Sequence, residues 1–443
     1  MSQIHEQRRL RFTEAMEGRA AALIVSHPEM IRNNDVLHEY RQDSDLYYLT
    51  GFQEPESALL LLPQNQEQRF VMFVRPRDPE KEVWTGIRTG VDGAKTVHGA
   101  DAAYTIAELP EVLPKLLDGA DSLYMNIGQD RDRDAVALEM LNRTRRGTRS
   151  GIPGPSRLVD AATILHEMRL RKDAAEIANL EKAAAITALA HGEAMAAVRP
   201  GLFEYEIQAV LEYNFRRGGC HRWGYASIVG SGPNATVLHY ESNDRRMEDG
   251  ELLLIDAAGE LGYQSADITR TFPVSGRFTP PQRKLYEVVL DAEKKAIERC
   301  RPGVRFQEVH ETALRAIVEG MIACGLVKGD PDTVIREETY KRYFMHKTSH
   351  WLGMDVHDVG RYMRDGESRL LEPGMVLTVE PGIYVSAADT EAPAEYLGIG
   401  IRIEDDVLIT DIGNRVLTSG VPKEVAEVEA LCGSRPLEPF RLA

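Results

Sequence analysis

A long helical stretch near the middle of the chain constrains its architecture more than any other feature. Residues 164–198, "ILHEMRLRKDAAEIANLEKAAAITALAHGEAMAAV", are rich in alanine, contain almost no cluster of β-branched residues, and end at "RPG", residues 199–201. This composition predicts helix. Because a chain of 443 residues is also too long for one small core, we predict two domains, residues 1–172 and residues 173–443.

The first part has the pattern of an α/β domain. Short apolar runs with β-branched or aromatic residues predict strands at 21–26, 46–52, 58–63, 69–74 and 122–128. The segments "ELPEVLPKLLDGA" and "DAVALEMLNRTRR" predict helices in the same region. The one basic cluster, "RTRRGTR", is interpreted as a solvated surface loop. Its arginines are Arg143, Arg145, Arg146 and Arg149.

The second part predicts a mixed α+β domain. One helix is expected to start at Thr279 as N-cap with Pro280 in the first position, and to stop before Pro302. The next, "RFQEVHETALRAIVEGMIACG", is expected to end at Gly325. Strands grouped in pairs are predicted at 252–258, 263–274, 375–385 and 398–409.

Composition and charge narrow the class of protein. With 53 Lys and Arg against 69 Asp and Glu, the formal charge is −16, which disfavours nucleic acid and anionic membranes as partners. The first twenty residues lack the apolar core of a signal peptide, and no run approaches the ~18 apolar residues of a membrane span. The cysteines form no C-x-x-C pair, which fits a reducing compartment. These are Cys220, Cys300, Cys324 and Cys432. We therefore expect a cytoplasmic enzyme.

Two aspartates stand in the first predicted strand pair. In "ELLLIDAAGELGYQSADITRTFPV", Asp256 follows an apolar run and Asp267 lies in the second strand. With the turn centred on Glu260 and Leu261, Asp256 is expected to face residue 265, so that Asp267 is its diagonal neighbour on the same face, roughly 7–8 Å away. Taken alone, such an aspartate more often simply borders a strand. Two ionised carboxylates this close repel each other unless a cation lies between them.

Two glutamates stand in similar strands. Glu380 in "MVLTVEPGIYV" precedes Pro381, which is expected to mark an edge or a bulge. In "GIGIRIEDD" the alternation places Arg402 and Glu404 on one face, where a solvent-exposed ion pair is the ordinary interpretation. Taken together, however, the four carboxylates favour a metal site over four unrelated surface or strand-end residues, since two divalent cations would neutralise their charge. Carboxylate-rich sites favour hard ions such as Mn²⁺.

Three histidines crowd the segment "YFMHKTSHWLGMDVHDVG", residues 343–360. They are His346, His350 and His357. The first two have the i, i+4 spacing of H-E-x-x-H zinc peptidases, but Lys347 occupies the position of the general base. Gly353 and Gly360 also disfavour a long helix through the segment. The remaining interpretation is that one histidine joins the carboxylates as a metal ligand while its neighbours bind substrate.

These motifs together resemble a known family. The order D, D, H, E, E of the candidate ligands is similar to that of the dinuclear-metal peptidases of the pita-bread fold. "DITRTFPV", "SHWLGMDVHDVG", "LTVEPGIY" and "GIRIEDD" resemble the motifs of its Xaa-Pro aminopeptidase (aminopeptidase P) branch. "YRQDSDLYYLTGFQEPES", residues 40–57, resembles the first domain of that branch. The resemblance implies an α/β N-terminal domain followed by an α+β pita-bread (creatinase/aminopeptidase-like) catalytic domain.

The resemblance also implies a reaction and a set of metal ligands. The reaction is removal of the first residue from peptides with proline in second position, by a hydroxide bridging two divalent ions. Asp256 and Glu404 are implied as ligands, with Glu404 and Asp267 spanning or chelating the two ions. His350 is implied to bind one metal only, and Glu380 to act as both ligand and proton shuttle.

Other residues are implied to bind substrate or support the ligands. His239, in "VLHYES", is implied to line the substrate site with His346 and His357, and His357 to lie near the scissile carbonyl. Arg402 is implied to hold a ligand carboxylate together with Tyr384. One departure from the family is Lys347, where a small residue is usual; we expect its side chain to point to solvent.

Three alternatives remain at this stage. A dipeptide-specific prolidase would use the same site with a pocket closed after proline, and the N-terminal resemblance argues against it. A metal-free pita-bread binding module and a metal-independent creatinase-type enzyme would both have lost ligands, whereas this chain keeps all five.

The family also commonly forms homo-oligomers, dimers or tetramers, in which Trp84 of "EVWTGI" is a candidate contact.

Overall fold

The computed structural model describes residues 3–128, 131, 134–135, 138–139, 141–142 and 154–438. The arginine-rich loop predicted at 143–149 lies outside these residues, as does part of the helix predicted at 134–146. The chain forms two compact units, Met1–Met168 and Arg169–Ala443. The domain boundary near residue 172 stays a prediction. No helix among the described residues is both long and apolar enough to span a membrane.

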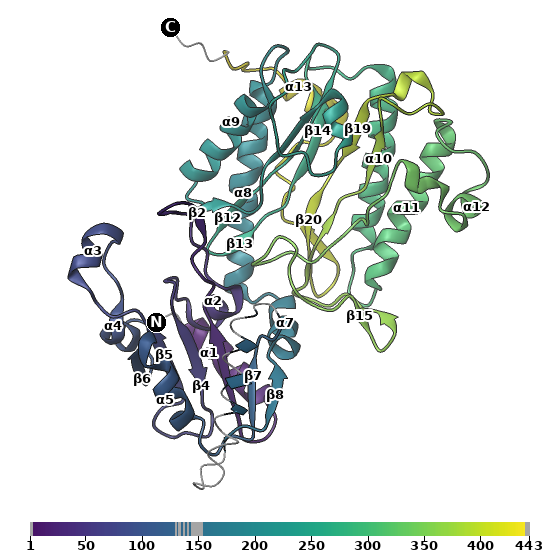
Figure 1. The fold of residues 1–443 in the computed structure, drawn as a ribbon. Coiled ribbons are helices and arrows are strands. Elements are labelled where there is room, and N and C mark those ends of the chain that lie inside the picture. The colour runs from purple at the N-terminus through teal and green to yellow at the C-terminus, as the bar shows by residue number, and fades with distance from the viewer. Residues whose placement is uncertain are drawn as a thin grey trace. The chain divides into compact units, whose positions relative to one another are not determined.

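A mixed six-stranded sheet is the centre of the first unit (Figure 1). Its strands, in spatial order, are β6 (Ala102–Thr105), β5 (Phe70–Val74), β4 (Ala58–Leu61), β1 (Ala20–Val25), β7 (Ser122–Met125) and β8 (Arg157–Asp160). The helices of this unit include α1 (Gln3–Ala15), α3 (Pro79–Thr85), α4 (Gly90–Thr96) and α5 (Leu109–Leu116). Alternate residues of β1, β4, β5 and β7 bury one face against α5. The predicted α/β pattern of this region is therefore present.

One strand predicted in this unit is wrong. Residues 46–52 form most of helix α2 (Ser44–Thr50) instead of a strand. Asp43 caps this helix by accepting the backbone N–H of Leu46 at 2.9 Å, and Gly51 ends it with a φ of 66°. Of the aromatic residues that suggested a strand, Tyr48 is buried on the helix, Tyr47 is half-buried on it, and Phe52 is buried just after it, so the capping residues were the stronger signal.

The helical stretch at 164–198 is interrupted in the structure. Helix α7 (Ala162–Leu170) ends three residues before α8 (Ala174–Ala197) begins. Asp173 starts α8 by accepting the backbone N–H groups of Ala175 and Glu176 at 2.9 and 3.0 Å. The alanine-rich composition predicted helix on both sides of this break but gave no sign of it, because the cap acts through one side chain.

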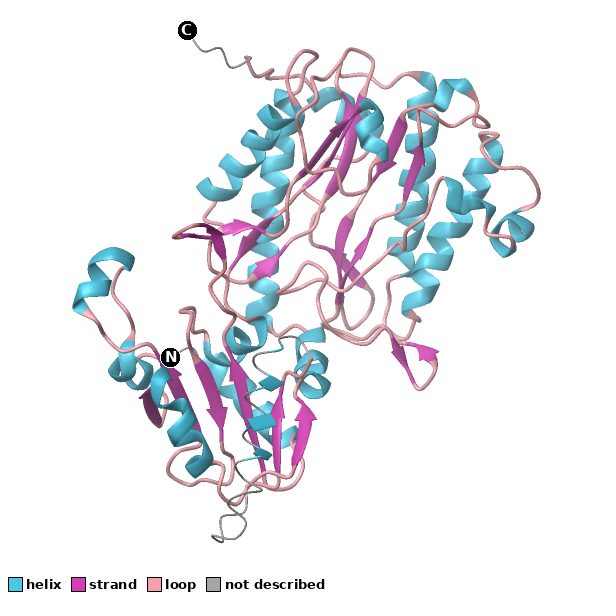
Figure 2. Ribbon diagram, viewed as in Figure 1, coloured by secondary structure: helices cyan, strands magenta, loops and turns pink. Residues whose placement is uncertain are grey.

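In the second unit, helices cover the strands on both sides (Figure 2). Helices α8 and α9 (Glu204–Arg217) lie on one side and α10 (Pro280–Arg299) and α11 (Phe306–Ala323) on the other (Figure 1). Short helices follow, α12 (Pro331–Arg336) and α13 (Val425–Leu431). The predicted N-terminal signal of α10 is confirmed, since Thr279 donates its backbone N–H to Gln282 Oε1 at 2.9 Å. Gly325 follows α11 with a φ of 72°, as predicted.

Three of the four long strands predicted in this unit are each divided into two shorter ones, and the fourth, predicted at 252–258, ends at Asp256. The strands include β9 (Arg222–Trp223), β10 (Ile228–Ser231), β11 (Leu252–Asp256), β12 (Gly259–Leu261), β13 (Gln264–Ser265), β14 (Thr269–Pro273), β17 (Val376–Val379), β18 (Gly382–Val385), β19 (Ile399–Arg402), β20 (Asp405–Ile409) and β21 (Asn414–Val416), and a separate hairpin is formed by β15 (Met363–Arg364) and β16 (Glu367–Ser368). They form sheets β10-β11-β14, β13-β12-β9, β17-β20-β21 and β18-β19. The chain therefore changes sheets at 266–268, at 380–381 and at 403–404.

The register predicted for the first strand pair is wrong by four residues. Asp256 lies opposite Thr269 instead of residue 265, because the turn is made by Gly262 and Tyr263, which both have positive φ. A displacement by an even number of residues leaves every side chain on its predicted face. Asp267 is thus still the diagonal neighbour of Asp256. It lies two residues before Thr269, the observed partner of Asp256, whereas the prediction placed it two residues after the partner at 265.

Candidate metal centre

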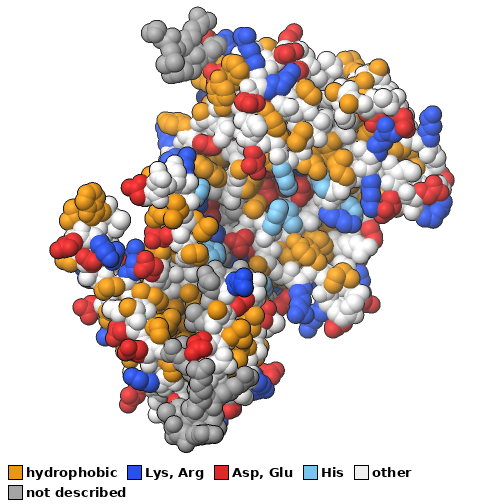
Figure 3. Space-filling view, viewed as in Figure 1, with side chains coloured by type: hydrophobic (Ala, Val, Ile, Leu, Met, Phe, Trp, Pro, Cys, Tyr) orange, Lys and Arg blue, Asp and Glu red, His pale blue; other side chains and the backbone are white. Residues whose placement is uncertain are grey.

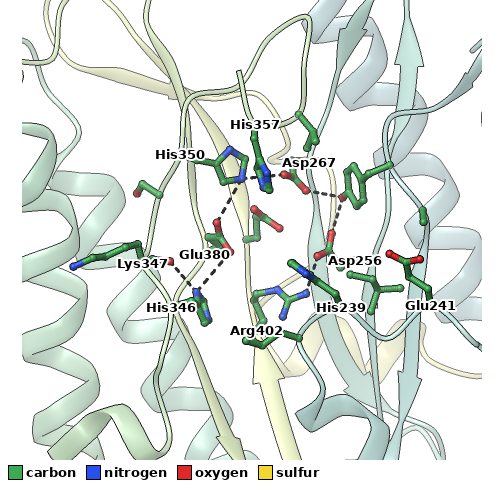
Figure 4. Close-up of a pocket in the computed structure, with 17 residues that line it drawn as sticks. His239, Glu241, Asp256, Asp267, His346, Lys347, His350, His357, Glu380 and Arg402 are labelled. Atoms are coloured by element: carbon green, nitrogen blue, oxygen red, sulfur yellow. Dashed lines mark hydrogen bonds and ion pairs between the residues drawn. The ribbon is translucent and has the colours of Figure 1, made fainter. Parts of the chain in front are cut away.

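All nine side chains predicted for the site line one cavity of about 450 Å³ in the second unit (Figure 4). They are His239, Asp256, Asp267, His346, His350, His357, Glu380, Arg402 and Glu404. Figure 3 shows histidine and acidic side chains gathered close together on the face that is drawn. The structure therefore brings together residues that lie up to 165 positions apart in the sequence, from 239 to 404.

The carboxylates stand where strands end or change sheets. Asp256 is the last residue of β11, and Glu380 follows β17 immediately before Pro381. Asp267 lies between β13 and β14, and Glu404 between β19 and β20. At these breaks the backbone leaves one ladder for another, so the side chains point into the space between the sheets.

Two carboxylates and one histidine are within reach of a common ion, and a third carboxylate lies beside them. His350 Nε2 lies 3.3 Å from Asp267 Oδ2 and 3.5 Å from Glu380 Oε1. One ligand atom each from Asp267, His350 and Glu404 lie within 4.8 Å of one another. The backbone of His350 is held on β17, because its N–H donates to Thr378 Oγ1 at 3.1 Å and its carbonyl accepts the N–H of Thr378 at 3.0 Å.

Arg402 organises the carboxylates from behind. It is nearly fully buried and donates to Asp256 Oδ2 at 2.7 Å, to Thr269 Oγ1 at 3.0 Å and to the Tyr384 hydroxyl at 3.0 Å. Thr269 in turn donates to Glu404 Oε2 at 2.7 Å. The solvent-exposed interpretation of Arg402 and Glu404 is therefore wrong, because the outer face of β19 is covered in the folded protein.

Tyr225, which the sequence did not suggest, bridges two of the carboxylates. Its hydroxyl lies 2.6 Å from both Asp256 Oδ1 and Asp267 Oδ1. A phenol has one proton, so it can donate to only one of the two carboxylates. Tyr225 lies in the loop before β10, far from every quoted motif, whereas Thr269 could have been found because it lies two residues after Asp267 on the same strand face.

The pKa values show that the cluster lacks positive charge. Burial raises the pKa of Glu380 to about 7, and burial with the charge of Asp267 raises that of Glu404 well above its usual range. Burial also raises the pKa of Asp267. Burial alone would lower the pKa of His350, but the hydrogen bond to Asp267 and the charge of Glu380 raise it to about 9.

This donor set fits divalent cations. Hard oxygen donors with one imidazole suit a hard divalent ion, and the buried positive charges of Arg402 and protonated His350 do not balance four carboxylates. The hydroxyl of Tyr225 has only one proton for the two carboxylates that it contacts, which also indicates that the cluster needs cations. The residues of this chain thus fit a metal group, with Arg402 and Thr269 orienting the ligands.

His346 and His357 lie beside the cluster. Nδ1 of His346 is 2.8 Å from the carbonyl of Lys347, which can only accept, so this nitrogen donates. Its Nε2 therefore accepts from the Tyr384 hydroxyl at 2.8 Å, and burial lowers the pKa of His346 to about 4, which keeps it neutral. The ring of His357 meets that of His350 edge to face, with centroids 4.4 Å apart.

Lys347 is exposed, as expected, although its residue borders the cavity. In Figure 4 its side chain extends away from the carboxylates. The departure from the family pattern therefore adds no cation to the cluster itself.

Comparison with known proteins agrees with this geometry. The sequence profile of metallopeptidase family M24 matches residues 178–411, and that of the aminopeptidase P N-terminal domain matches residues 5–124. The chain belongs to metallopeptidase family M24. It is 44% identical to the Xaa-Pro aminopeptidase of Escherichia coli, over 97% of this chain and 98% of that protein.

Solved structures of family M24 have the same fold. Aminopeptidase PepP of Pseudomonas aeruginosa matches with a TM-score of 0.95 and 47% identity, covering 96% of this chain and 97% of that one. A variant of Escherichia coli aminopeptidase P in complex with substrate matches with a TM-score of 0.94 and 44% identity, covering 97% of both chains. The resemblance and the fold class predicted from the sequence, including the pita-bread domain, are confirmed.

Proposed function

We propose that the chain is an Xaa-Pro aminopeptidase, which removes the first residue from peptides with proline in second position. The observation that carries the proposal is the buried cluster of four carboxylates and one histidine, organised by Arg402, in a chain similar over its whole length to proteins with that name. The metal ligands are Asp256, Asp267, His350, Glu380 and Glu404.

These residues would hold two divalent cations, most simply Mn²⁺, which would supply Lewis-acid chemistry by lowering the pKa of the attacking water and polarising the carbonyl that precedes proline. Glu380, whose carboxylate lies beside the ligand His350, takes a proton from the attacking water and gives it to the departing imino nitrogen. His357, beside the ligand His350, donates a hydrogen bond to the developing oxyanion.

The remaining residues orient the substrate and the ligands. His239 and His346 line the cavity, and the neutral His346 is fixed in one orientation by its two hydrogen bonds. Arg402 holds the carboxylate of Asp256 in place, and Tyr384 holds Arg402 by accepting a hydrogen bond from it.

Two alternative functions are less well supported. A dipeptide-specific prolidase shares this site, but the match to the aminopeptidase P N-terminal domain favours the aminopeptidase. A metal-free binding module has no need of four buried carboxylates that repel one another.

We further propose a cytoplasmic homo-oligomer, a dimer or tetramer, with peptides as its partners. Helix α3 and the residues after it expose Val83, Trp84 and Ile87, each more than 80% accessible. An exposed apolar group of this kind is typical of a protein contact. Trp84→Ala is expected to weaken assembly in sedimentation experiments and activity on longer peptides; unchanged behaviour in both would remove this contact from the proposal.

The deciding experiment is hydrolysis of Arg-Pro-Pro by metal-stripped protein titrated with Mn²⁺, followed by amino-acid analysis. Release of free arginine that reaches a plateau near two Mn²⁺ per chain would support the reaction, the cleavage site and the dinuclear centre. Glu380→Gln is the matched control, since it keeps the shape of the side chain and removes the proton shuttle. Bound Mn²⁺ without arginine release would favour a prolidase, and no bound metal would favour a binding module.

A further inference from the structure

A buried carboxylate lies next to His357 in the sequence and points the opposite way. Asp358 accepts a hydrogen bond from Arg169 Nη2 at 2.6 Å and another from Lys172 Nζ at 2.8 Å. All three side chains are at least 98% buried. Two buried cations on one carboxylate form a contact that holds a loop in one place, because moving either partner leaves a charge without compensation.

The two cations come from one short segment, residues 169–172, which we call the junction segment. Arg169 also donates to Asp355 Oδ2 at 2.7 Å, so the junction segment contacts the loop on both sides of His357. Residues 353–360 are called here the His357 loop. The backbone N–H of Asp358 donates to the carbonyl of Trp351 at 2.9 Å, which closes this loop next to the ligand His350.

The glycines of the His357 loop follow from the same packing. A Cβ on Gly353 would lie 2.6 Å from Lys172 Cε, and a Cβ on Gly360 would lie 2.9 Å from Leu170 Cδ1. Gly360 also has a φ of 132°, which disfavours any other residue. The glycines that break the histidine segment in the sequence are thus the places where the junction segment fits against the loop.

We propose that Arg169 and Lys172 are positioning residues that set the place of His357 through Asp358. The inference rests on the role of His357 in the proposed function, and it extends that role to a segment outside every quoted motif of the site. Neither Arg169 nor Lys172 lines the cavity, and the side chains of both contact the His357 loop, so we expect them to affect the reaction through that loop.

The test compares Lys172→Met with a matched control in the same segment. Arg171 pairs with Glu372 at 2.9 Å on the surface, and both are more than one-third exposed, so Arg171→Met removes an ion pair without touching the loop. We expect Lys172→Met to lower kcat on Arg-Pro-Pro by about tenfold with unchanged bound Mn²⁺, as a small displacement of a catalytic group does. Arg171→Met is expected to match wild type, and Lys172→Arg to restore most of the loss.

A second comparison separates positioning from a general loss of stability. In a His357→Ala background, Lys172→Met is expected to change kcat less than twofold, about 0.4 kcal/mol, because its target is already gone. An equal fold-loss in both backgrounds would overturn the inference. If Lys172→Met does not fold, Asp358→Asn keeps the side-chain shape, weakens both contacts and is expected to show the same pattern.

Hydrogen exchange provides a measurement that does not depend on the substrate. Lys172→Met is expected to speed amide exchange of residues 353–360, and Arg171→Met to leave it unchanged. Unchanged exchange in Lys172→Met would overturn the inference. A wild-type chain that does not cleave Arg-Pro-Pro would instead contradict the proposed function, while the exchange result would still decide whether the junction segment fixes the loop.

Discussion

The carboxylates and the histidines of the site are held by different kinds of structure. Each carboxylate stands at the end of a strand or in a short break between strands, where paired backbone nearby limits its position; Asp256, for example, is fixed by pairing with both Ile228 and Thr269. His239 and His357 stand on loops, which have no ladder to fix them. Their positions depend instead on buried side chains that hold each loop from within.

The two histidine loops use one buried carboxylate each, in opposite ways. Asp358 holds the His357 loop by pairing with two cations. Glu204, fully buried at the start of α9, holds the loop of His239 with neutral donors. It accepts from Ser231 Oγ at 2.7 Å, from the Tyr240 hydroxyl at 2.8 Å and from the backbone N–H of Arg245 at 2.9 Å.

This difference predicts how the two groups respond to substitution. Strand-borne residues can lose a side-chain function without moving, because their backbone is held by its neighbours. Loop-borne histidines can keep their chemistry and still lose activity when a distant carboxylate is changed. The comparison can be tested by substituting one of the carboxylates held near strands and by substituting a residue that supports one of the histidine loops.

The largest effect is expected for Asp267→Asn. The change removes a charge that the proposed ions require, and loss of one ion corresponds to about 4 kcal/mol, or about 10³-fold in kcat/KM on Arg-Pro-Pro. Because the carboxylates repel each other, the metal-free variant is expected to unfold at a higher temperature than metal-free wild type. Metal analysis and thermal unfolding check both statements. A variant that is inactive and also less stable without metal would contradict strand-held positioning.

The carboxylates that the sequence predicted for the site line one cavity in the structure, and there is a physical reason why the sequence could bring them together. Carboxylates after apolar runs have a local signal, and strand parity kept Asp256 and Asp267 on one face even though the register was wrong by four residues. The long strands were predicted without their breaks, because a change of sheet depends on neighbours far away in the chain.

The supporting residues could not be predicted in the same way. Tyr225 and Glu204 have no motif around them, and their partners lie on other elements. The helix at 44–50 was missed because aromatic content outweighed the caps at Asp43 and Gly51. The family resemblance supplied the histidine roles, which spacing alone left open.

The metal-free protein is expected to become less stable as the pH rises. Glu380 has its pKa raised from 4.5 to about 7 and His350 from 6.5 to about 9. A group whose pKa is higher in the folded state than in the unfolded state contributes its full stabilisation at pH values below the unfolded-state pKa. That stabilisation is lost as the pH rises through the folded-state pKa. This stability is lost between about pH 4.5 and 7 for Glu380 and between about pH 6.5 and 9 for His350.

Thermal unfolding of metal-stripped protein from about pH 5 to about pH 9 measures this loss. Saturating Mn²⁺ is the control, since a bound cation replaces the protons and should flatten the profile. A flat profile without metal would mean that the carboxylates are not crowded in solution as they are in the structure.

A smaller effect is expected for Glu204→Gln on the loop side. The amide of glutamine would place its own N–H groups against donors from which Glu204 now accepts hydrogen bonds. The loop of His239 should therefore shift, and kcat should fall about tenfold with unchanged metal content. Asp244→Asn is the matched control, because Asp244 is an exposed residue of the same loop that also contacts Tyr240. A loss of bound metal in Glu204→Gln would show that this loop and the carboxylates are not held independently.

The smallest effect is expected for Lys347→Gly, which introduces the small residue usual in the family. Lys347 lies next to His346 in the sequence, but its exposed side chain extends away from the carboxylates (Figure 4). Its charge acts on His310, whose pKa burial and Lys347 lower to about 4. We therefore expect kcat/KM on Arg-Pro-Pro and Mn²⁺ affinity to change less than about twofold. A tenfold gain in Mn²⁺ affinity would mean that the charge of Lys347 reaches the strand-borne ligands, and that the loop and the strands are coupled through electrostatics even where their side chains do not touch.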